Sequence, residues 1–314
     1  MNAIDLKARE YEFTSGDFER VRTLIYEIAG ISLSSSKQDM VYSRLARRLR
    51  DRGLTRFADY LRLLESNDAE EMQAFTNALT TNLTAFFREA HHFPILADHI
   101  AERRRASPEP ITIWCCAAST GEEPYTIAMT AIEALNDPSP PVRILATDVD
   151  TNVLAKAEAG IYDQERIDAL SPERVRRFFL RGTGQRDGLV MVRPELRRLI
   201  TFQQINLLDN QWPVRGPLDV IMCRNVMIYF DKDTQRQILI KFAPVMRSDG
   251  LLFAGHSESF VHSSDLFKLK GKTVYSPLPL ARTGAYRTTT GSNRTPTQTQ
   301  RIPTVTNRSQ VTRG

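Results

Sequence analysis

Apolar residues in the first third of the chain recur every three or four positions, the spacing of a helix with one buried face. The first such segment contains Phe18, Val21, Leu24, Ile25 and Ile28. Similar segments follow as far as Leu79, with breaks at Gly53 and at Ser66-Asn67-Asp68. The pattern predicts an all-helical domain over residues 17–90, preceded by an N-terminal arm at 1–16.

The pattern changes at residue 111, where short continuous apolar runs begin to alternate with helical segments. The runs span residues 111–116, 142–147, 218–223 and 251–254. The intervening helices start at Pro124, include Val153, Leu154 and Ala157, and cover 234–247. Strands that alternate with helices indicate a mostly parallel α/β sheet, here assigned to residues 91–280.

A segment with different composition lies within this domain. Glycine-rich turns at 181–188 are followed by strand-like residues at 188–193 and 199–203. We expect a small antiparallel β insertion at 181–204, although an ordinary edge of the main sheet would have the same pattern.

The last 34 residues contain six arginines and no acidic residue. The net charge of the whole chain is +5, so residues 1–280 carry a net charge near −1. The basic character of the chain therefore comes from the tail, and it argues only weakly for a nucleic-acid partner. Residues 281–314 are rich in Thr, Arg, Asn and Gln, and we expect them to be disordered.

The three cysteines, Cys115, Cys116 and Cys223, have neither C-x-x-C spacing nor a neighbouring histidine. We therefore expect no disulfide framework and no metal site. The N-terminus lacks the basic and apolar regions of a signal peptide, and no apolar run reaches the ~18 residues of a membrane helix. These features predict a cytoplasmic protein.

Small residues follow the first strand in the stretch Cys116-Ala-Ala-Ser-Thr-Gly121, where a ligand could approach the backbone. Glu122 and Glu123 then begin a helix, at a point where a phosphate site would have no carboxylate. Asp148 ends the second strand, a common place for an acid that binds ribose hydroxyls. The combination fits a cationic adenosine ligand such as S-adenosylmethionine, although helix caps and surface acids would give a similar pattern.

Five motifs together resemble the chemotaxis receptor-glutamate methyltransferases (CheR-type) over residues 17–277. They are Asn82-Leu-Thr-Ala-Phe-Phe-Arg88, Ala118-Ser-Thr-Gly-Glu-Glu-Pro-Tyr125, Asn206-Leu-Leu208, Cys223-Arg-Asn-Val-Met-Ile-Tyr-Phe230 and Gly250-Leu-Leu-Phe-Ala-Gly-His-Ser-Glu258. The resemblance implies the helical domain plus a Rossmann-like class I methyltransferase sheet domain. The adjacent cysteines and the Arg/Thr tail depart from the family pattern.

The resemblance also implies roles for individual residues in binding S-adenosylmethionine. Asn82, Thr84 and Arg88 would close over the methionine moiety, with Arg88 on its carboxylate. Glu122 would lie beside the methionyl end, although Glu123 is an open alternative. The remaining assignments are Asp148 on the ribose, Asn206 and Leu207 on the adenine, Arg224 and Asn225 in the pocket wall, and Tyr229 nearest the transferred methyl.

The implied reaction would convert S-adenosylmethionine to S-adenosylhomocysteine and a receptor glutamate to its methyl ester. A glutamate carboxylate, with a pKa of about 4.3, is already ionised at neutral pH and is itself the nucleophile. A general base is not required, and the sequence shows no Ser-His-Asp or Cys-His pattern. We therefore expect structural roles for His91, His92 and His256.

The implied partner is the acidic cytoplasmic helical region of a chemoreceptor. Arg44, Arg47 and Arg48 share one helical face that could steer such a partner, although a solvated basic face is the ordinary explanation. In some family members the antiparallel insertion binds a receptor C-terminal peptide as an added strand. The resemblance implies a monomer.

Two other readings use the same motifs. A nucleic-acid methyltransferase would usually carry an Asn/Asp-Pro-Pro-Tyr/Phe motif after the fourth strand, where this chain has Cys223-Arg-Asn-Val226. A non-catalytic receptor-docking or cofactor-sensing module would retain the cofactor residues without methyl transfer.

Overall fold

The computed structural model describes residues 9–66 and 68–279. The predicted tail at 281–314 and residues 1–8 of the predicted N-terminal arm lie outside the described residues. The first four helices are α1 (Ser15–Ala29), α2 (Gln38–Asp51), α3 (Phe57–Glu65) and α4 (Ala69–Leu79). Their apolar faces pack on one another and on Phe13 to form a core of their own, which includes Val21, Leu45, Tyr60 and Phe75.

The first helix shows how local sequence sets these boundaries. The Thr14 side chain accepts a hydrogen bond from the Asp17 N–H, and the Asp17 carboxylate accepts one from the Thr14 N–H. This capping box satisfies N–H groups that a helix start otherwise leaves unpaired. Gly30 ends the helix at φ +68°, a left-handed conformation that glycine adopts without steric strain.

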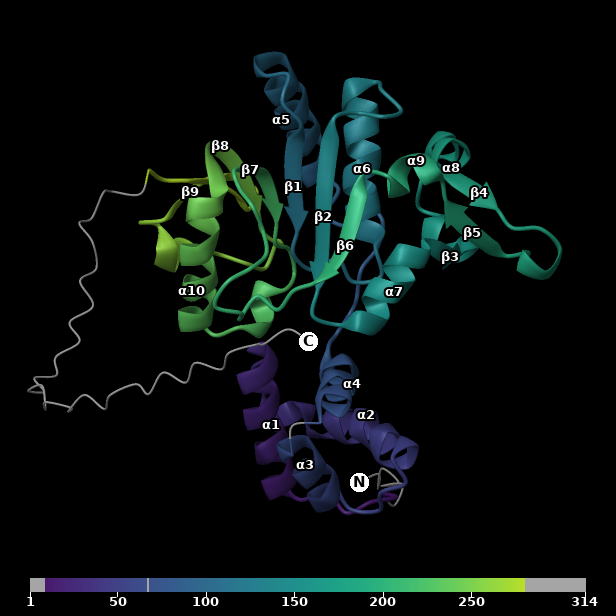
Figure 1. Cartoon of the computed structure of the whole chain (residues 1–314), viewed down its shortest axis with the longest axis vertical. Helices are drawn as coiled ribbons and strands as arrows, with labels where there is room; N and C mark the ends of the chain where they lie inside the picture. Colours follow the sequence, from purple (N-terminus) through teal and green to yellow (C-terminus); the bar gives the residue numbers. More distant parts are fainter. Residues whose placement is uncertain (1–8, 67, 280–314) are drawn as a thin grey trace, which may run out of the picture. The chain divides into compact units, whose positions relative to one another are not determined.

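A seven-stranded sheet forms the centre of the second domain (Figure 1). Its order is β6-β2-β1-β7-β8-β10-β9, and only the pairings of β10 with β8 and with β9 are antiparallel. The strands are β1 (Ile111–Cys115), β2 (Val142–Asp148), β6 (Ile200–Gln204), β7 (Leu218–Met222), β8 (Met246–Phe253), β9 (Phe267–Gly271) and β10 (Val274–Pro277). The chain leaves β1 for β2 on one side and later enters β7 on the other, so the strand order reverses at β1. Such a switch point opens a crevice at the carboxyl ends of the strands.

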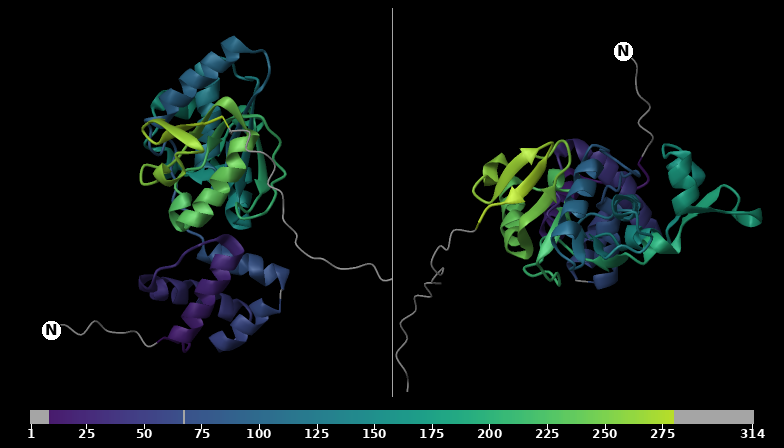
Figure 2. Two further views of the ribbon diagram at one scale, coloured as in Figure 1. Left: turned by 90° about the vertical axis from the view of Figure 1, so that its left-hand side faces the viewer. Right: turned by 90° about the horizontal axis from the view of Figure 1, so that it is seen from above.

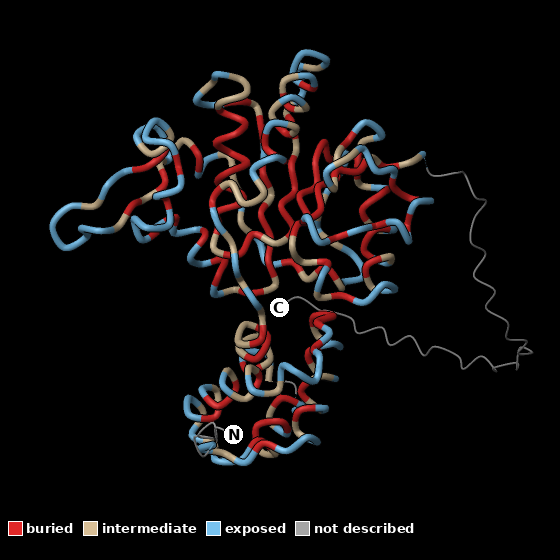
Figure 3. The backbone as a smooth tube through the Cα atoms, turned by 180° about the vertical axis from the view of Figure 1, so that it is seen from behind, coloured by how far each residue is buried: buried red, intermediate tan, exposed pale blue. Residues whose placement is uncertain are grey.

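Helices cover both faces of this sheet (Figure 1). One face packs on α5 (His92–Ala106) and α6 (Glu122–Leu135), and the other packs on α10 (Lys232–Phe242). Alternate residues of β1 serve the two faces, with Ile113 in one core and Trp114 in the other. The central strands are consequently buried on both sides (Figure 3). The helix α7 (Thr151–Ala159) follows β2.

A separate three-stranded antiparallel sheet extends from this domain (Figure 2). It consists of β3 (Ile161–Asp163), β4 (Phe179–Arg181) and β5 (Leu189–Val192), in the order β3-β5-β4. The short helices α8 (Pro172–Phe178) and α9 (Pro194–Arg197) flank it. The loop at 183–188 between β4 and β5 is exposed (Figure 3).

The observed extent corrects the predicted insertion at 181–204. Residues 200–204 form β6, which pairs in parallel with β2 at the edge of the main sheet. The central strand β5 instead pairs with β3 and β4, which come before the predicted segment except for Arg181. A half-exposed edge strand and a hairpin strand have the same alternation of apolar and polar residues, which is why the pattern could not distinguish them.

Candidate functional site

A cavity of about 390 Å³ lies at the carboxyl ends of β1, β2 and β7. Its volume is in the usual range for a small-molecule site. Its wall comes from the helical domain (29, 31–34, 37 and 40), from the joining segment (79–84 and 88) and from the sheet domain (116, 117, 119, 123, 148, 149, 205–207, 224–226 and 228–230). Glu122 does not line the cavity. The other residues predicted to bind the cofactor or to border its methyl group all do, namely Asn82, Thr84, Arg88, Asp148, Asn206, Leu207, Arg224, Asn225 and Tyr229.

The loop after β1 is shaped by backbone hydrogen bonds to both neighbouring strands. Cys116 N–H donates to the Met222 carbonyl at 2.9 Å, and Ala118 N–H donates to the Thr147 carbonyl at 2.8 Å. Gly121 then turns the chain at φ +99°. A Cβ at Gly121 would lie 2.7 Å from the Tyr162 hydroxyl oxygen, so the close approach requires glycine.

Asp148 presents a buried carboxylate to the cavity. Its Oδ2 accepts the Ser119 N–H at 2.8 Å and its Oδ1 accepts the Asp150 N–H at 3.0 Å. Burial raises the pKa of Asp148 to about 6 despite these hydrogen bonds. Each carboxylate oxygen has a further lone-pair direction, so Asp148 can accept hydrogen bonds from two adjacent hydroxyl groups.

The two adjacent glutamates after Gly121 point to different surroundings. Glu122 is buried away from the cavity, where it pairs with Arg166 and accepts the Thr120 hydroxyl at 2.6 Å. Glu123 lines the cavity and pairs with Arg224 at 2.7 Å. Glu122 was the glutamate expected beside the ligand, with Glu123 as the open alternative. Only Glu123 of the two lines the cavity, because successive residues on a helix differ by about 100° in direction.

Glu123 is largely buried beside Arg224, with 11% of its side chain exposed. Burial raises its pKa, while the Arg224 guanidinium and the Cys115 thiol act in the opposite direction. The Cys115 Sγ lies 3.4 Å from Glu123 Oε1 and donates a hydrogen bond to it. Because Glu123 and Arg224 occupy the same wall, the cavity offers both a carboxylate and a guanidinium to a ligand with both charges.

Glu89 is a site residue that the sequence analysis missed. Its carboxylate lies 3.2 Å from Arg224 Nη2 and accepts hydrogen bonds from the Asn225 side chain at 3.0 Å and from His256 Nδ1 at 2.9 Å. Burial raises the pKa of Glu89, but these hydrogen bonds and the charge of Arg224 outweigh it and hold the pKa at about 2. Its position directly after Arg88 in a matched motif was the available signal.

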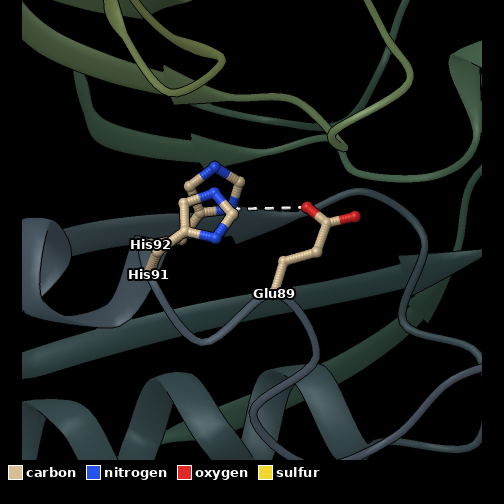
Figure 4. A group of neighbouring side chains, drawn as sticks. All are labelled: Glu89, His91 and His92. Carbon is tan, nitrogen blue, oxygen red and sulfur yellow. Dashed lines mark ion pairs between the residues drawn. The ribbon is translucent and has the colours of Figure 1, made fainter.

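Glu89 also lies beside His91 and His92, and the three side chains face one another (Figure 4). His92 Nε2 donates to the Lys272 carbonyl at 2.8 Å, and burial lowers the pKa of His92 to about 4, so its ring is neutral. Imidazole and carboxylate are ligand types for transition metals. A divalent cation here would nevertheless lie next to the Arg224 guanidinium that shares the Glu89 carboxylate. We therefore assign Glu89 to holding Arg224 and Asn225.

The segment that joins the two domains is fixed by hydrogen bonds along its length. The Asn82 side chain donates to Asp150 Oδ2 at 2.8 Å, and the Ser119 hydroxyl donates to the Asn82 carbonyl at 3.2 Å. Arg166 donates to the Thr84 carbonyl at 3.1 Å. Arg88 donates from Nη1 to the Leu83 carbonyl at 2.6 Å. Asn82 thus holds this edge of the cavity in place through Asp150.

Asn206 links the cavity to the helical domain. Its side-chain amide donates to the Ile28 carbonyl near the end of α1 at 2.6 Å, and its Oδ1 accepts the Leu208 N–H at 3.0 Å. Nearby, Ser32 N–H donates to the carbonyl of Tyr229 at 2.9 Å. The polar side chain of Asn206 is therefore engaged in positioning the loop, and the buried Leu207 is one of the apolar residues of this wall.

The model of the CheR methyltransferase SAM-binding domain matches residues 82–276, and that of the CheR methyltransferase all-alpha domain matches residues 16–80. The chain belongs to the CheR methyltransferase family. The expected fold, a helical domain followed by a class I methyltransferase-like sheet domain with a small antiparallel sheet, is confirmed.

Several curated CheR relatives align over most of their length. The chain is 53% identical to "Chemotaxis protein methyltransferase 2" of Pseudomonas aeruginosa over 86% of this chain and 95% of that protein. It is 56% identical to "Chemotaxis protein methyltransferase" of Escherichia coli over 82% of this chain and 90% of that protein. A "Probable chemotaxis protein methyltransferase" of Rhizobium etli is 41% identical over 75% and 89%.

The three arginines of the predicted basic face differ in how this CheR chain uses them. Arg44 donates to the Leu79 carbonyl at 3.0 Å and to the Thr80 carbonyl at 2.7 Å, at the end of α4. Arg48 binds both oxygens of the buried Glu71, at 3.0 and 2.7 Å. Arg47 is exposed. Arg44 and Arg48 therefore join α2 to α4. Of the three arginines, Arg47 is the most exposed.

The three cysteines of this CheR chain are buried and free. Burial raises the pKa of each thiol. Cys116 contributes to the cavity wall as a small apolar group. Among the described residues, no helix is long and apolar enough to span a membrane.

Proposed function

We propose that the protein transfers a methyl group from S-adenosylmethionine to glutamate side-chain carboxylates of chemoreceptor cytoplasmic helices. The products would be glutamate methyl esters and S-adenosylhomocysteine. The family match and the names of the relatives support the reaction class. The observation that supports the proposal for this chain is that Asp148 and Glu123 line the cavity. Two carboxylates would repel a phosphate group but suit a positively charged ligand with ribose hydroxyls.

The charges of the cavity match the groups of the proposed cofactor one by one. Asp148 would accept hydrogen bonds from the ribose hydroxyls, and Leu207 would pack against the adenine. Glu123 would face the positive methionyl end. Arg88 has five guanidinium N–H donors, of which the Leu83 carbonyl takes one, so it can also bind a carboxylate. Asn82, Thr84, Asn206 and Asn225 would shape the wall through the hydrogen bonds described above.

Bound S-adenosylmethionine would supply the methyl group as a sulfonium, and the C–S bond would break as a C–O bond forms to the glutamate. The protein's residues need not move a proton, because the receptor carboxylate is already ionised. Their contribution is to hold the carboxylate and the methyl group in line. They also exclude water from the negative carboxylate and the positive sulfonium, whose charges neutralise each other in the reaction. Tyr229, half-buried in the cavity wall, would border the transferred methyl.

Receptor binding would use surfaces outside the cavity. The exposed Arg47 could attract acidic receptor helices. In the antiparallel sheet, β3 and β4 each pair with β5 on one side only, so either edge could take up a receptor peptide as a further strand. If the substrates are the cytoplasmic helices of chemoreceptors, the protein acts in the cytoplasm.

Incubation with methyl-labelled S-adenosylmethionine and either receptor cytoplasmic fragments or nucleic acid tests the proposal. We expect base-labile label on the receptor fragment and none on nucleic acid, with loss of labelling in Asp148→Asn. Label on nucleic acid would contradict the proposal and support a nucleic-acid methyltransferase instead. Cofactor binding without transfer to any substrate would replace it with a sensing module.

A further inference from the structure

Two large apolar side chains on the wall of the cavity remain exposed to solvent. Leu83, in the segment between α4 and α5, is 76% exposed, and Ile228, in the turn after β7, is 50% exposed. Other exposed apolar residues, such as Val261 at 74%, do not line the cavity. Isolated exposed apolar residues are common, but two at the border of one cavity are typical of a binding surface.

Both side chains are presented by hydrogen-bonded backbone. The Leu83 carbonyl accepts from Arg88, and the preceding residue Asn82 is held by Asp150. On the other side, the buried carboxylate of Glu258 accepts the N–H groups of Ile228 at 3.3 Å and of Asn225 at 3.0 Å. The positions of Leu83 and Ile228 are therefore fixed before any partner arrives, which reduces the entropy that binding would cost.

The same wall carries positive charge next to the apolar pair. Lys37 and Arg88 both line the cavity, and the half-buried Tyr229 directly follows Ile228. A partner that fits must offer an anionic group to enter the cavity and apolar groups to cover its border. On an amphipathic helix, residues three or four positions before and after a glutamate lie on the same face as that glutamate. One helix can thus present a carboxylate and apolar neighbours on both sides of it.

We propose that Leu83 and Ile228 form an apolar rim that receives the apolar residues flanking the target glutamate on a receptor helix. This inference rests on the proposed function and adds a determinant of which glutamates are accepted. When the helix covers the rim, water leaves the space around the glutamate carboxylate, and the apolar contact is made only by a partner with apolar residues at those positions.

The test measures methylation of a receptor cytoplasmic fragment by the full chain and by Leu83→Ser and Ile228→Ser. We expect KM for the receptor to rise about tenfold for each variant, which corresponds to about 1.4 kcal/mol, because serine removes apolar surface that the partner would bury. The dissociation constant for S-adenosylmethionine, measured by calorimetry, should stay within twofold. Leu83→Met should restore most of the receptor affinity. Val261→Ser, at a position about as exposed as Leu83 but away from the cavity, should leave KM unchanged.

A second arm changes the receptor. Serine at the apolar positions three or four residues from one target glutamate should raise KM for the wild-type enzyme but should add little further to Leu83→Ser, since the two changes remove the same contact. Additive effects, an unchanged receptor KM, or a parallel loss of cofactor affinity would overturn the apolar rim. If the wild-type protein methylates no receptor fragment at all, the proposed function itself fails. If the wild type and the rim variants methylate the fragment equally well, the proposed function stands and only the apolar rim fails.

Discussion

Glu89 Oε2 lies 3.2 Å from Arg224 Nη2, although the two residues are 135 positions apart in the sequence. Arg224 also pairs with Glu123 at 2.7 Å, so one buried guanidinium is held between two carboxylates from different segments. The triad joins the segment after α4, the start of α6 and the loop after β7. The wall of the cavity is therefore fixed by charge as well as by packing.

Replacing Glu89 by glutamine keeps its shape but removes the charge that faces Arg224. Because hydrogen bonds to charged groups contribute about 1.5–3 kcal/mol, we expect S-adenosylmethionine affinity to fall at least tenfold in Glu89→Gln, as measured by calorimetry. The exposed Glu102→Gln serves as the control and should bind normally. Normal binding by Glu89→Gln would mean that Glu89 does not position the cavity wall.

Glu122 and Glu123 offer a matched pair of substitutions. Glu123→Gln should weaken cofactor binding by about tenfold or more, because the carboxylate facing the cavity is lost. In Glu122→Gln the amide stays beside Arg166 outside the cavity, and the dissociation constant should change by less than threefold. The opposite order of effects in calorimetry would return the binding role to Glu122.

The raised pKa of Asp148 predicts a pH dependence of cofactor binding. The carboxylate must be ionised to accept two hydroxyl hydrogen bonds, and its pKa in the folded protein is about 6. Affinity should therefore be full above about pH 7 and should decline as the pH falls through 6, where a surface aspartate would still be ionised. Asp148→Asn should bind weakly and should lose this dependence; titrations between pH 5 and 8 compare the two. A wild-type affinity that is constant over that range would contradict the prediction.

Arg47 and Arg48 should respond differently to charge reversal. Arg47→Glu should raise the receptor KM several-fold while the thermal midpoint stays the same, because Arg47 is exposed. Arg48→Glu would place a carboxylate against the buried Glu71, and we expect it to lower the free energy of unfolding by about 3 kcal/mol. Denaturant unfolding separates the effects, and equal stability of the two variants would contradict the assignment.

The cysteines should be dispensable and unreactive. A Cys115→Ser, Cys116→Ala double variant should keep methyl transfer within a few-fold of wild type, since serine can still donate to Glu123. In the wild type, burial and raised thiol pKa values should prevent reaction with a thiol reagent at pH 8 until denaturant is added. Rapid labelling of the native protein, measured by absorbance, would contradict this prediction.

The sequence predicted most of the cavity because its residues follow strand ends. Asp148 comes at the carboxyl end of β2, and Arg224 and Asn225 follow β7, so their meeting follows from a parallel sheet. The choice between Glu122 and Glu123 could not be made, since it depends on how Gly121 at φ +99° orients the first helical turn. Glu89 was missed because its partners lie 135 to 167 residues away and no local pattern indicates them.

The basic face illustrates a second limit of sequence patterns. Helical spacing placed Arg44, Arg47 and Arg48 together, and all three line one surface hollow. Spacing alone does not tell a solvated arginine from one that binds carbonyl groups at the end of another helix. That difference depends on the packing of α2 against α4, which brings Glu71 and the Leu79 carbonyl within reach.

The hydrogen bond from Asn206 to the Ile28 carbonyl affects how the protein can be divided. The two family matches meet between residues 80 and 82, yet residues 29, 31–34 and 37 of the first contribute to the cavity of the second. A fragment beginning at residue 82 would lack this part of the wall and would leave the Asn206 amide without its acceptor. The two domains would thus be expected to evolve as one unit, with exchange of either between relatives tolerated only when the α1 end and the Asn206 loop are exchanged together.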